Sequence, residues 1–405
     1  MDASTARATG TGGAPGGPRF AVVGVPENRR VTLFAAAVRA AGLPAPRVLP
    51  WREVLDAGVW FRPGETVRID SPGEDPAVDR RLRGVADPTR VEGTGLWYAR
   101  FTGALRGIAD AARASGARLL DDPAELAVLF DKRLCHRVLD EAGIAVPPSP
   151  TSGAGAAPVR GWPDVRALLG TAGLRRAFVK LAHGSSASGV LAVERAGPGR
   201  VRAATSVERG ADGALFNSLR VRRYTSEREI GAIIDTLAPD GLHVERWLPK
   251  ASLGGRAADL RVVVVGGRAT HALVRTSRSP MTNLHLGGAR GDLSAARAAT
   301  AAAGVPFDAV LELAERAAGC FPGTLCVGVD LLPGTGWRRF AVGEVNAFGD
   351  LLPGLPGLPG GGAAGLDTYG AQVAAVHRDT WHDTRGPGEG SPGRGHEEHH
   401  RDATA

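Results

Sequence analysis

The first 120 residues alternate short apolar runs with amphipathic stretches, and this alternation restricts the fold more than any other feature. Residues 20–24 form an apolar run typical of a buried strand, and apolar residues then recur at helical spacing up to Ala41. The alternation continues with short strands at 47–49 and 66–69 and a helix at 95–114. It predicts an open α/β domain with parallel strands over residues 18–122.

A second region begins with a helix and is then dominated by strands. Asp122 followed by Pro123 and Glu125 is a helix N-terminal signature, and we expect this helix to continue past Lys132. A second helix should end before Gly143. Beyond a loop at 151–160, strands are expected at 177–181, 190–194, 214–218, 243–247, 260–265 and 269–276, helices at Phe307–Ala318 and Thr368–His377, and a hairpin of 324–332 with Phe340–Asn346.

Composition excludes several classes of protein. The chain has 405 residues, enough for two or three domains, and its 43% apolar content can fill their cores. The net charge of +7 comes from scattered arginines, which argues against nucleic-acid binding and suits small anionic partners such as nucleotides. Three cysteines without a CxxC pair, and the absence of a signal sequence or an apolar run of ~20 residues, predict a reduced, cytoplasmic protein with no membrane span.

Both ends of the chain are expected to be disordered tails, at 1–17 and 381–405. The second tail contains a GxGxxG match at 388–393 and an HExxH match at 396–400. The first motif needs a flanking strand and helix, and the second needs a helix and a third ligand. Neither context is present in this Gly/Pro-rich sequence, so neither match is taken as a site.

Three oxygen-bearing side chains gather on the predicted C-terminal hairpin. Glu344 and Asn346 share one face of their strand, and Asp330 can stand opposite them. Two carboxylates ~4 Å apart repel by ~4 kcal/mol in a partly screened site, which a cation between them offsets. Carboxylate and amide oxygens are ligands for Mg²⁺. The alternative is that these are ordinary exposed hairpin residues.

Lys180 ends an apolar strand just before the Gly/Ser loop 183–189. The backbone N–H groups of such a loop can close over phosphates, and the lysine adds a point charge. The alternative is a lysine at a strand end followed by a hairpin turn.

Two further segments suit a nucleotide. Residues 244–249 run as a strand into a proline, which leaves edge backbone groups that can pair with an adenine. Arg261 and Arg275 lie near Asn283 and the pair Gly287-Gly288, and guanidinium groups match phosphate oxygens. Surface arginines of an arginine-rich chain are the alternative.

Taken in order, these motifs resemble those of the ATP-grasp superfamily, nearest to its RimK-like and glutathione-synthetase-like members. The resemblance covers residues 123–352. It rests on Asp131-Lys132-Arg133, Val179-Lys180 with the Gly/Ser loop, 245–248, Asp259-Leu260-Arg261, Asn283 with Gly287-Gly288, Gly328-Val329-Asp330 and Glu344-Val345-Asn346.

The resemblance implies a fold and a set of roles. It implies a Rossmann-like pre-ATP-grasp α/β domain at 18–122 and an α+β ATP-grasp fold at 123–380, whose two lobes are a nucleotide lobe at about 150–250 and a metal lobe at about 251–380. Asp330, Glu344 and Asn346 would hold two Mg²⁺ ions, which Mn²⁺ can replace, and Arg261 and Arg275 would be catalytic. The implied ATP-binding residues are Lys132, Lys180, Ser185, Ser186, Gly189, Glu245, Trp247, Leu248 and Asn283.

The implied activity is that of a ligase that phosphorylates a carboxylate with Mg-ATP and couples the acyl-phosphate to an amine. Its partners would be small-molecule or peptide acids and amines, without nucleic acid or membrane, and the protein could form a homo-oligomer. Two alternatives stay open: a kinase-like phosphotransferase and a nucleotide-binding protein without turnover.

Overall fold

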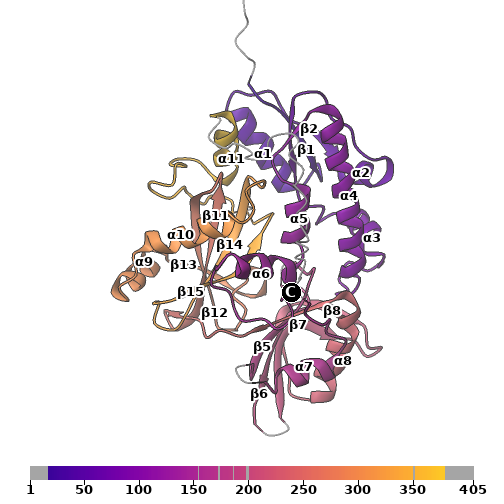
Figure 1. Cartoon of the computed structure of the whole chain (residues 1–405), viewed down its shortest axis with the longest axis vertical. Coiled ribbons are helices and arrows are strands. Elements are labelled where there is room, and N and C mark those ends of the chain that lie inside the picture. The colour runs from indigo at the N-terminus through magenta and orange to yellow at the C-terminus, as the bar shows by residue number, and fades with distance from the viewer. Residues whose placement is uncertain are drawn as a thin grey trace, which may run out of the picture.

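The computed structural model describes residues 17–153, 155–171, 174–185, 187–197, 200–349 and 352–378. They form three sheets with helices packed against them (Figure 1). Within this part of the chain, none of the helices has the length and apolar character needed to cross a bilayer.

The N-terminal sheet is parallel, as the alternating pattern predicts. Its strand order is β2-β1-β3-β4. Its strands are β1 (Arg19–Gly24), β2 (Arg47–Pro50), β3 (Glu65–Ile69) and β4 (Arg118–Leu119). Its helices are α1 (Arg29–Ala40), α2 (Trp51–Ala57), α3 (Pro76–Arg83) and α4 (Thr94–Ser115). The sequence analysis missed α2 and α3, because an apolar repeat is hard to detect in helices of seven or eight residues.

The break between two predicted helices lies earlier in the chain than expected. Asp122 caps α5 (Pro123–Leu129) as expected, but α5 ends before Lys132. A second cap explains the break: the Asp131 side chain accepts from the N–H groups of Arg133 and Leu134 and starts α6 (Lys132–Glu141). The prediction that the first helix continues past Lys132 is therefore wrong. Its correction places Lys132 at the first helical position.

A five-stranded antiparallel sheet follows, in the order β8-β7-β6-β5-β9. It comprises β5 (Arg176–Leu181), β6 (Leu191–Arg195), β7 (Val201–Arg209), β8 (Leu215–Tyr224) and β9 (Leu242–Arg246), covered by α7 (Trp162–Leu168), α8 (Glu227–Leu237) and the 3₁₀ turn η1 (Ala238–Asp240). The sequence analysis missed β7 and α8, although α8 begins with a capping serine, Ser226, and repeats apolar residues at helical spacing.

The third sheet carries the predicted hairpin. Its order is β13-β12-β11-β14-β15, and β10 pairs with β11. The strands are β10 (Ser252–Leu253), β11 (Arg256–Val265), β12 (Arg268–Ser277), β13 (Ala289–Gly291), β14 (Cys326–Pro333) and β15 (Phe340–Asn346). Two helices, α9 (Leu293–Ala302) and α10 (Phe307–Ala318), accompany this sheet, and the turn η2 (Leu284–Leu286) precedes β13. The helix α10 has the bounds predicted from the sequence.

The last helix, α11 (Thr368–His377), also has its predicted bounds and ties the two ends of the described chain together. It lies beside α1 (Figure 1). Its buried Tyr369 shares an apolar cluster with Phe20 and Phe34 of the N-terminal domain and with Val263 of β11. The five-stranded sheet instead packs around a separate cluster built almost wholly from its own strands, α7 and α8. The N-terminal domain and the third sheet thus share core, whereas the second sheet has its own.

Candidate active site

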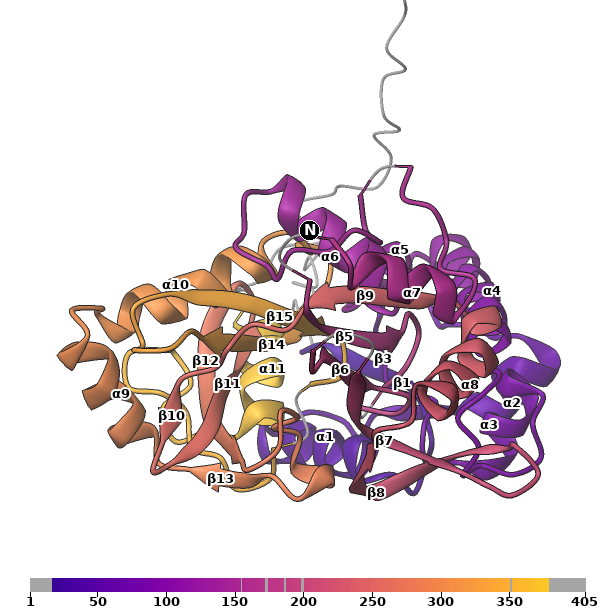
Figure 2. The same ribbon diagram turned by 90° about the horizontal axis from the view of Figure 1, so that it is seen from below.

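In Figure 2, β9 of the second sheet and β15 of the third sheet lie close together. Residues of both strands line a narrow cavity. Apolar residues of α5, α6 and β15 form one part of its wall, and charged residues from all sides form the rest. The lining residues are Leu129, Lys132, Cys135, His136, Leu139, Val146, Lys180, His243, Glu245, Val342, Gly343 and Glu344. Four predicted site residues are therefore brought together here: Lys132, Lys180, Glu245 and Glu344.

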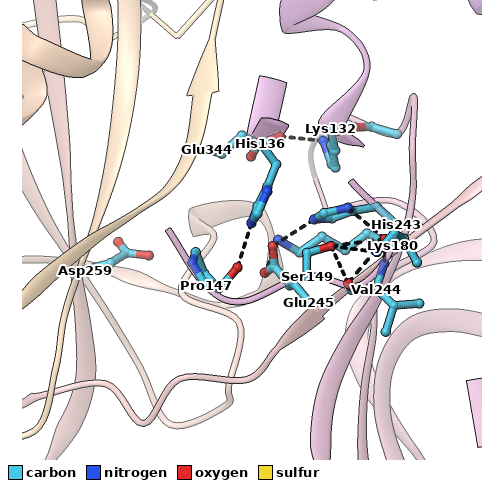
Figure 3. Close-up of polar contacts among 12 residues, drawn as sticks. Lys132, His136, Pro147, Ser149, Lys180, His243, Val244, Glu245, Asp259 and Glu344 are labelled. Carbon is cyan, nitrogen blue, oxygen red and sulfur yellow. Dashed lines mark hydrogen bonds and ion pairs between the residues drawn. The ribbon is translucent and has the colours of Figure 1, made fainter. Parts of the chain in front are cut away.

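Glu245 is buried and forms an ion pair with the partly buried Lys180 on the neighbouring strand. Lys180 Nζ lies 2.5 Å from Glu245 Oε1 (Figure 3). Burial favours a neutral Glu245, but Lys180 and His243 outweigh it and lower the pKa of Glu245 to about 2. Burial also acts to lower the pKa of Lys180, yet Glu245 and then Glu344 raise it above its usual value. Both groups are therefore charged at neutral pH.

Lys132 bridges the two lobes. Its ammonium donates to the backbone oxygen of Gly184, at 2.8 Å, and to Glu344 Oε1 on β15. The backbone N–H of Lys132 donates to the carbonyl oxygen of Ala182 at 2.9 Å. Because Gly184 belongs to the predicted phosphate loop, one lysine contacts both that loop and a predicted metal ligand.

The hairpin has the register that the predicted metal site requires. Asp330 pairs directly with Glu344 and Gly328 with Asn346. Asn346 Nδ2 donates to Gly328 O at 3.3 Å. The set is two carboxylates and one amide, an oxygen-rich set suited to Mg²⁺. Within the described residues there is no group of three or more His, Cys, Asp and Glu side chains placed to hold a metal.

The charge of both carboxylates is offset by basic side chains. Arg261 grips Asp330 through two nitrogens, with Nη2 at 3.0 Å from Oδ2, and Arg275 Nη2 lies 3.0 Å from Oδ1. Burial would raise the pKa of Asp330, but Arg261 and Arg275 hold it well below its usual range. Lys132 forms an ion pair with Glu344. The repulsion expected from the sequence is thus offset by the residues that the resemblance assigns to phosphate.

A second carboxylate supports Arg275 from the opposite side. Asp259 Oδ1 accepts from Arg275 Nε at 2.7 Å, and its Oδ2 contacts Lys250 and Thr282. Asp259 and Arg275 face each other on β11 and β12. Asp259 lies apart from the lysine–glutamate group (Figure 3), so it positions Arg275 and does not line the cavity.

The other predicted ATP-binding residues lie outside the cavity lining. The Asn283 side chain caps η2 by accepting from His285 N–H at 2.9 Å. Ser185 is exposed, and its carbonyl accepts from Ser188 N–H at 2.8 Å. Gly189 has φ of +66°, and a Cβ there would lie 2.5 Å from Leu181 Cδ1, so only glycine fits. Ser186 lies outside the described residues.

The end of β9 offers backbone groups as predicted. Arg246 N–H donates to Pro148 O at 2.8 Å, away from β5, and the carbonyl of a strand residue points to the same edge as its N–H. Arg246 C=O therefore lies on the edge that β5 does not cover. The N–H of Leu248 has no hydrogen-bond partner in the described part of the chain. The Trp247 ring packs under Arg176, 3.9 Å from its guanidinium carbon, and beside Phe178.

Among the polar or ionisable residues that line the cavity, sequence reasoning missed three: His136, His243 and Cys135. His243 had a usable signal, because it is two residues from Glu245 and shares its strand face. His136 Nε2 donates to Pro147 O at 2.6 Å, and its Nδ1 accepts from Ser152. Burial raises the pKa of Cys135 to about 12. Its thiol therefore stays protonated and unreactive, and it only lines the cavity.

Comparison with known proteins places this fold. No family model and no curated protein matches the chain. Among solved structures, the ATP-grasp ligase PsnB complexed with a phosphomimetic variant of a minimal precursor, Mg and ADP is similar at 18% identity and a TM-score of 0.52. That match covers 90% of this chain and 100% of PsnB. PsnB complexed with the minimal precursor is similar at 17% identity and a TM-score of 0.50, over 89% and 98%.

The chain therefore has the ATP-grasp fold. The resemblance to this superfamily, inferred from the order of the motifs, is confirmed at the level of the fold. Assignment to its RimK-like members stays a prediction.

Proposed function

We propose that the protein is an ATP-dependent ligase that activates a carboxylate as an acyl-phosphate and couples it to an amine. One observation carries the proposal: Lys132 and Lys180, from two different elements, face the Glu344 side of the Asp330–Glu344 pair across a single cavity. Phosphate-binding cations and oxygen ligands for a divalent ion lie together there, as phosphoryl transfer requires.

The nucleotide would enter between β9 and β15. Arg246 C=O and Leu248 N–H supply the acceptor and donor that an adenine edge needs. Leu129, Leu139 and Val342 supply apolar walls. Both oxygens of Glu245 already have partners, so we assign recognition of the exocyclic amine to the backbone of Arg246.

Asp330, Glu344 and Asn346 would hold Mg²⁺ or Mn²⁺, two ions by the resemblance. The bound metal would neutralise phosphate charge during transfer. Lys132 would then leave Glu344 and contact the phosphates. Arg261 and Arg275 would likewise leave Asp330 and contact the transferred phosphoryl group.

In the reaction, a carboxylate oxygen of the acid attacks the γ-phosphorus of ATP and ADP leaves. Arg261 and Arg275 stabilise the charge of the transferring phosphoryl group. The amine then attacks the acyl carbon, phosphate leaves, and the amine loses a proton. The Gly/Ser loop, anchored at Gly184 by Lys132, would keep water from the acyl-phosphate.

The substrates belong to the same proposal. PsnB is described in complex with a minimal precursor. Peptide and small-molecule carboxylates are the acids that we propose to test here. We also propose that the chain divides into a Rossmann-like domain at 18–122 and a second domain at 123–380. We further propose that the protein is cytoplasmic, forms homo-oligomers and has no nucleic-acid partner.

The test is ADP release from Mg-ATP in the presence of pools of peptide and small-molecule acids and amines, followed by mass spectrometry of the products. An amide product with stoichiometric ADP is the expected result. A stable phosphorylated product in amine-free reactions would instead indicate a kinase-like transfer. ATP binding without ADP from any pool would leave a nucleotide-binding protein and end the ligase proposal.

A further inference from the structure

A buried histidine on β9 holds the carboxylate of Glu245. His243 is 1% exposed, and its Nε2 lies 3.2 Å from Glu245 Oε2. Its Nδ1 lies 3.3 Å from Thr151 Oγ1, in the segment that links α6 to the second sheet. Glu245 in turn pairs with Lys180 on β5 (Figure 3). A line of contacts thus runs from the linker, through β9, to a lysine in the cavity wall.

The partners of His243 decide which ring nitrogen carries the proton. A carboxylate oxygen only accepts, so a bare Nε2 facing Glu245 would be repelled, and this contact favours Nε2 as the donor. Thr151 Oγ1 accepts from Val244 N–H at 2.8 Å, and its own hydrogen can be given to Nδ1. Val244 O at 3.3 Å and Ser149 Oγ at 3.1 Å are the other acceptors within reach. Burial lowers the pKa of His243 and keeps the ring neutral.

A neutral Nε2–H donor has a particular effect on Lys180. It fixes one oxygen of Glu245 without adding a second positive charge to the buried pair. Lys180 occupies the other oxygen, so both ends of the carboxylate are held and its plane is set. The position of the ammonium then follows from that of the carboxylate, because Lys180 is a long side chain with many rotamers.

We propose that His243 is a positioning residue for nucleotide binding: held by Thr151 as the neutral Nε2–H tautomer, it fixes Glu245, which presents Lys180 to the phosphates of the nucleotide. The last step rests on the proposed function, since it requires that Mg-ATP binds in this cavity. The tautomer and its dependence on Thr151 do not.

The experiment combines ring nitrogen shifts with nucleotide affinity. ¹⁵N shifts of His243 in histidine-labelled protein are assigned by their loss in His243→Leu. Dissociation constants for Mg-ATP come from calorimetry on wild type, His243→Leu, Thr151→Val and Thr151→Ser. The control is His271→Leu: His271 is equally buried and hydrogen-bonded, on β12, to Thr270 and Leu366 O, and it does not line the cavity.

We expect an Nε2–H tautomer in wild type and Mg-ATP binding weakened about tenfold in His243→Leu, the equivalent of one charge contact. Thr151→Val should show a mixed tautomer and an intermediate loss, and Thr151→Ser should restore both. His271→Leu should lose stability but keep wild-type affinity. If His243→Leu does not fold, the Thr151 pair carries the test.

An Nδ1–H or charged ring at neutral pH, or wild-type affinity in both His243→Leu and Thr151→Val, overturns the inference. These results differ from failure of the ligase proposal, in which wild type binds Mg-ATP without releasing ADP and the inference still stands. Wild type that binds no Mg-ATP overturns both.

Discussion

At the scale of single residues, the site is a set of paired opposite charges. Lys132 pairs with Glu344, Lys180 with Glu245, and Arg261 and Arg275 with Asp330. An unpaired buried charge is costly, so each partner stabilises the other until a ligand replaces it. Negatively charged phosphates would replace the carboxylates as partners of the basic side chains, and a divalent metal would replace the basic side chains as partner of the carboxylates. Binding of both ligands together therefore leaves no charge without a partner.

Glu344→Gln tests the metal role directly. The amide keeps the shape but loses the charge that would hold the metal, so turnover should fall at least about 100-fold, because even residues that merely support metal ligands cost 10–100-fold. The pair with Lys132 is partly exposed, so the unfolding free energy should change by less than about 1 kcal/mol. ADP release and thermal unfolding are the measurements. Exposed Glu312→Gln on α10 is the control, and equal turnover in both variants would refute the assignment.

Glu245 should make stability depend on pH in the acid range. Its pKa is lowered to about 2 in the folded protein, against an ordinary value of 4.5. The stabilisation is therefore fully present above pH 4.5 and is lost as the pH falls toward 2. Glu245→Gln lacks this contribution, so the difference in unfolding free energy from wild type should shrink from pH 6 to pH 3 in urea titrations. A difference that stays constant over that range would contradict the prediction.

At the scale of elements, a glycine on β14, Gly328, leaves room for the side chain of Arg261 on the neighbouring strand β11. A Cβ on Gly328 would lie 2.8 Å from Gly349 Cα and 3.1 Å from Arg261 Cδ. The small residue thus allows Arg261 to reach across to Asp330, which is the next but one residue of the same strand.

Gly328→Ala should therefore displace Arg261. We expect turnover to fall more than about tenfold, with a loss of about 1–3 kcal/mol of stability from overpacking. Gly107→Ala on α4 is the matched control, since nothing lies within 4 Å of its added Cβ and alanine favours a helix by up to about 1 kcal/mol. Urea unfolding and ADP release separate the two effects. Wild-type turnover in Gly328→Ala would show that turnover does not depend on the observed position of the Arg261 side chain.

At the scale of the whole molecule, the cores divide the chain unevenly. The N-terminal sheet, the third sheet and α11 share apolar clusters, whereas the second sheet has its own. A part of the molecule with a separate core can move or open by itself, which suits the proposed entry of a nucleotide.

Hydrogen exchange should show this division. Ile234→Ala on α8 removes buried methyl groups from the second-sheet core and should cost about 2–5 kcal/mol there. Exchange should speed up in β5–β9 and stay unchanged in β1 and β11. Tyr369→Ala on α11 should give the opposite pattern, with faster exchange in β1 and β11 together. Equal acceleration across all three sheets in either variant would show one cooperative unit.

The sequence by itself determined those features whose signal is local. The parallel N-terminal domain follows from alternating periods, and α10 and α11 follow from their apolar spacing. The hairpin of β14 and β15 was expected as well, but the sequence left open the register that sets Asp330 against Glu344, and the structure decides it. The short helices α2 and α7 left too few turns to show a period.

Only the tertiary structure decided who partners whom. Lys132 and Glu344 are 212 residues apart, and Asp259 reaches Arg275 only because β11 and β12 pair. The role of His243 likewise depends on a threonine 92 residues away. Charge and periodicity can be read directly from the sequence. A contact between distant side chains exists only after the sheets have packed, and that packing determines which basic side chain faces each carboxylate.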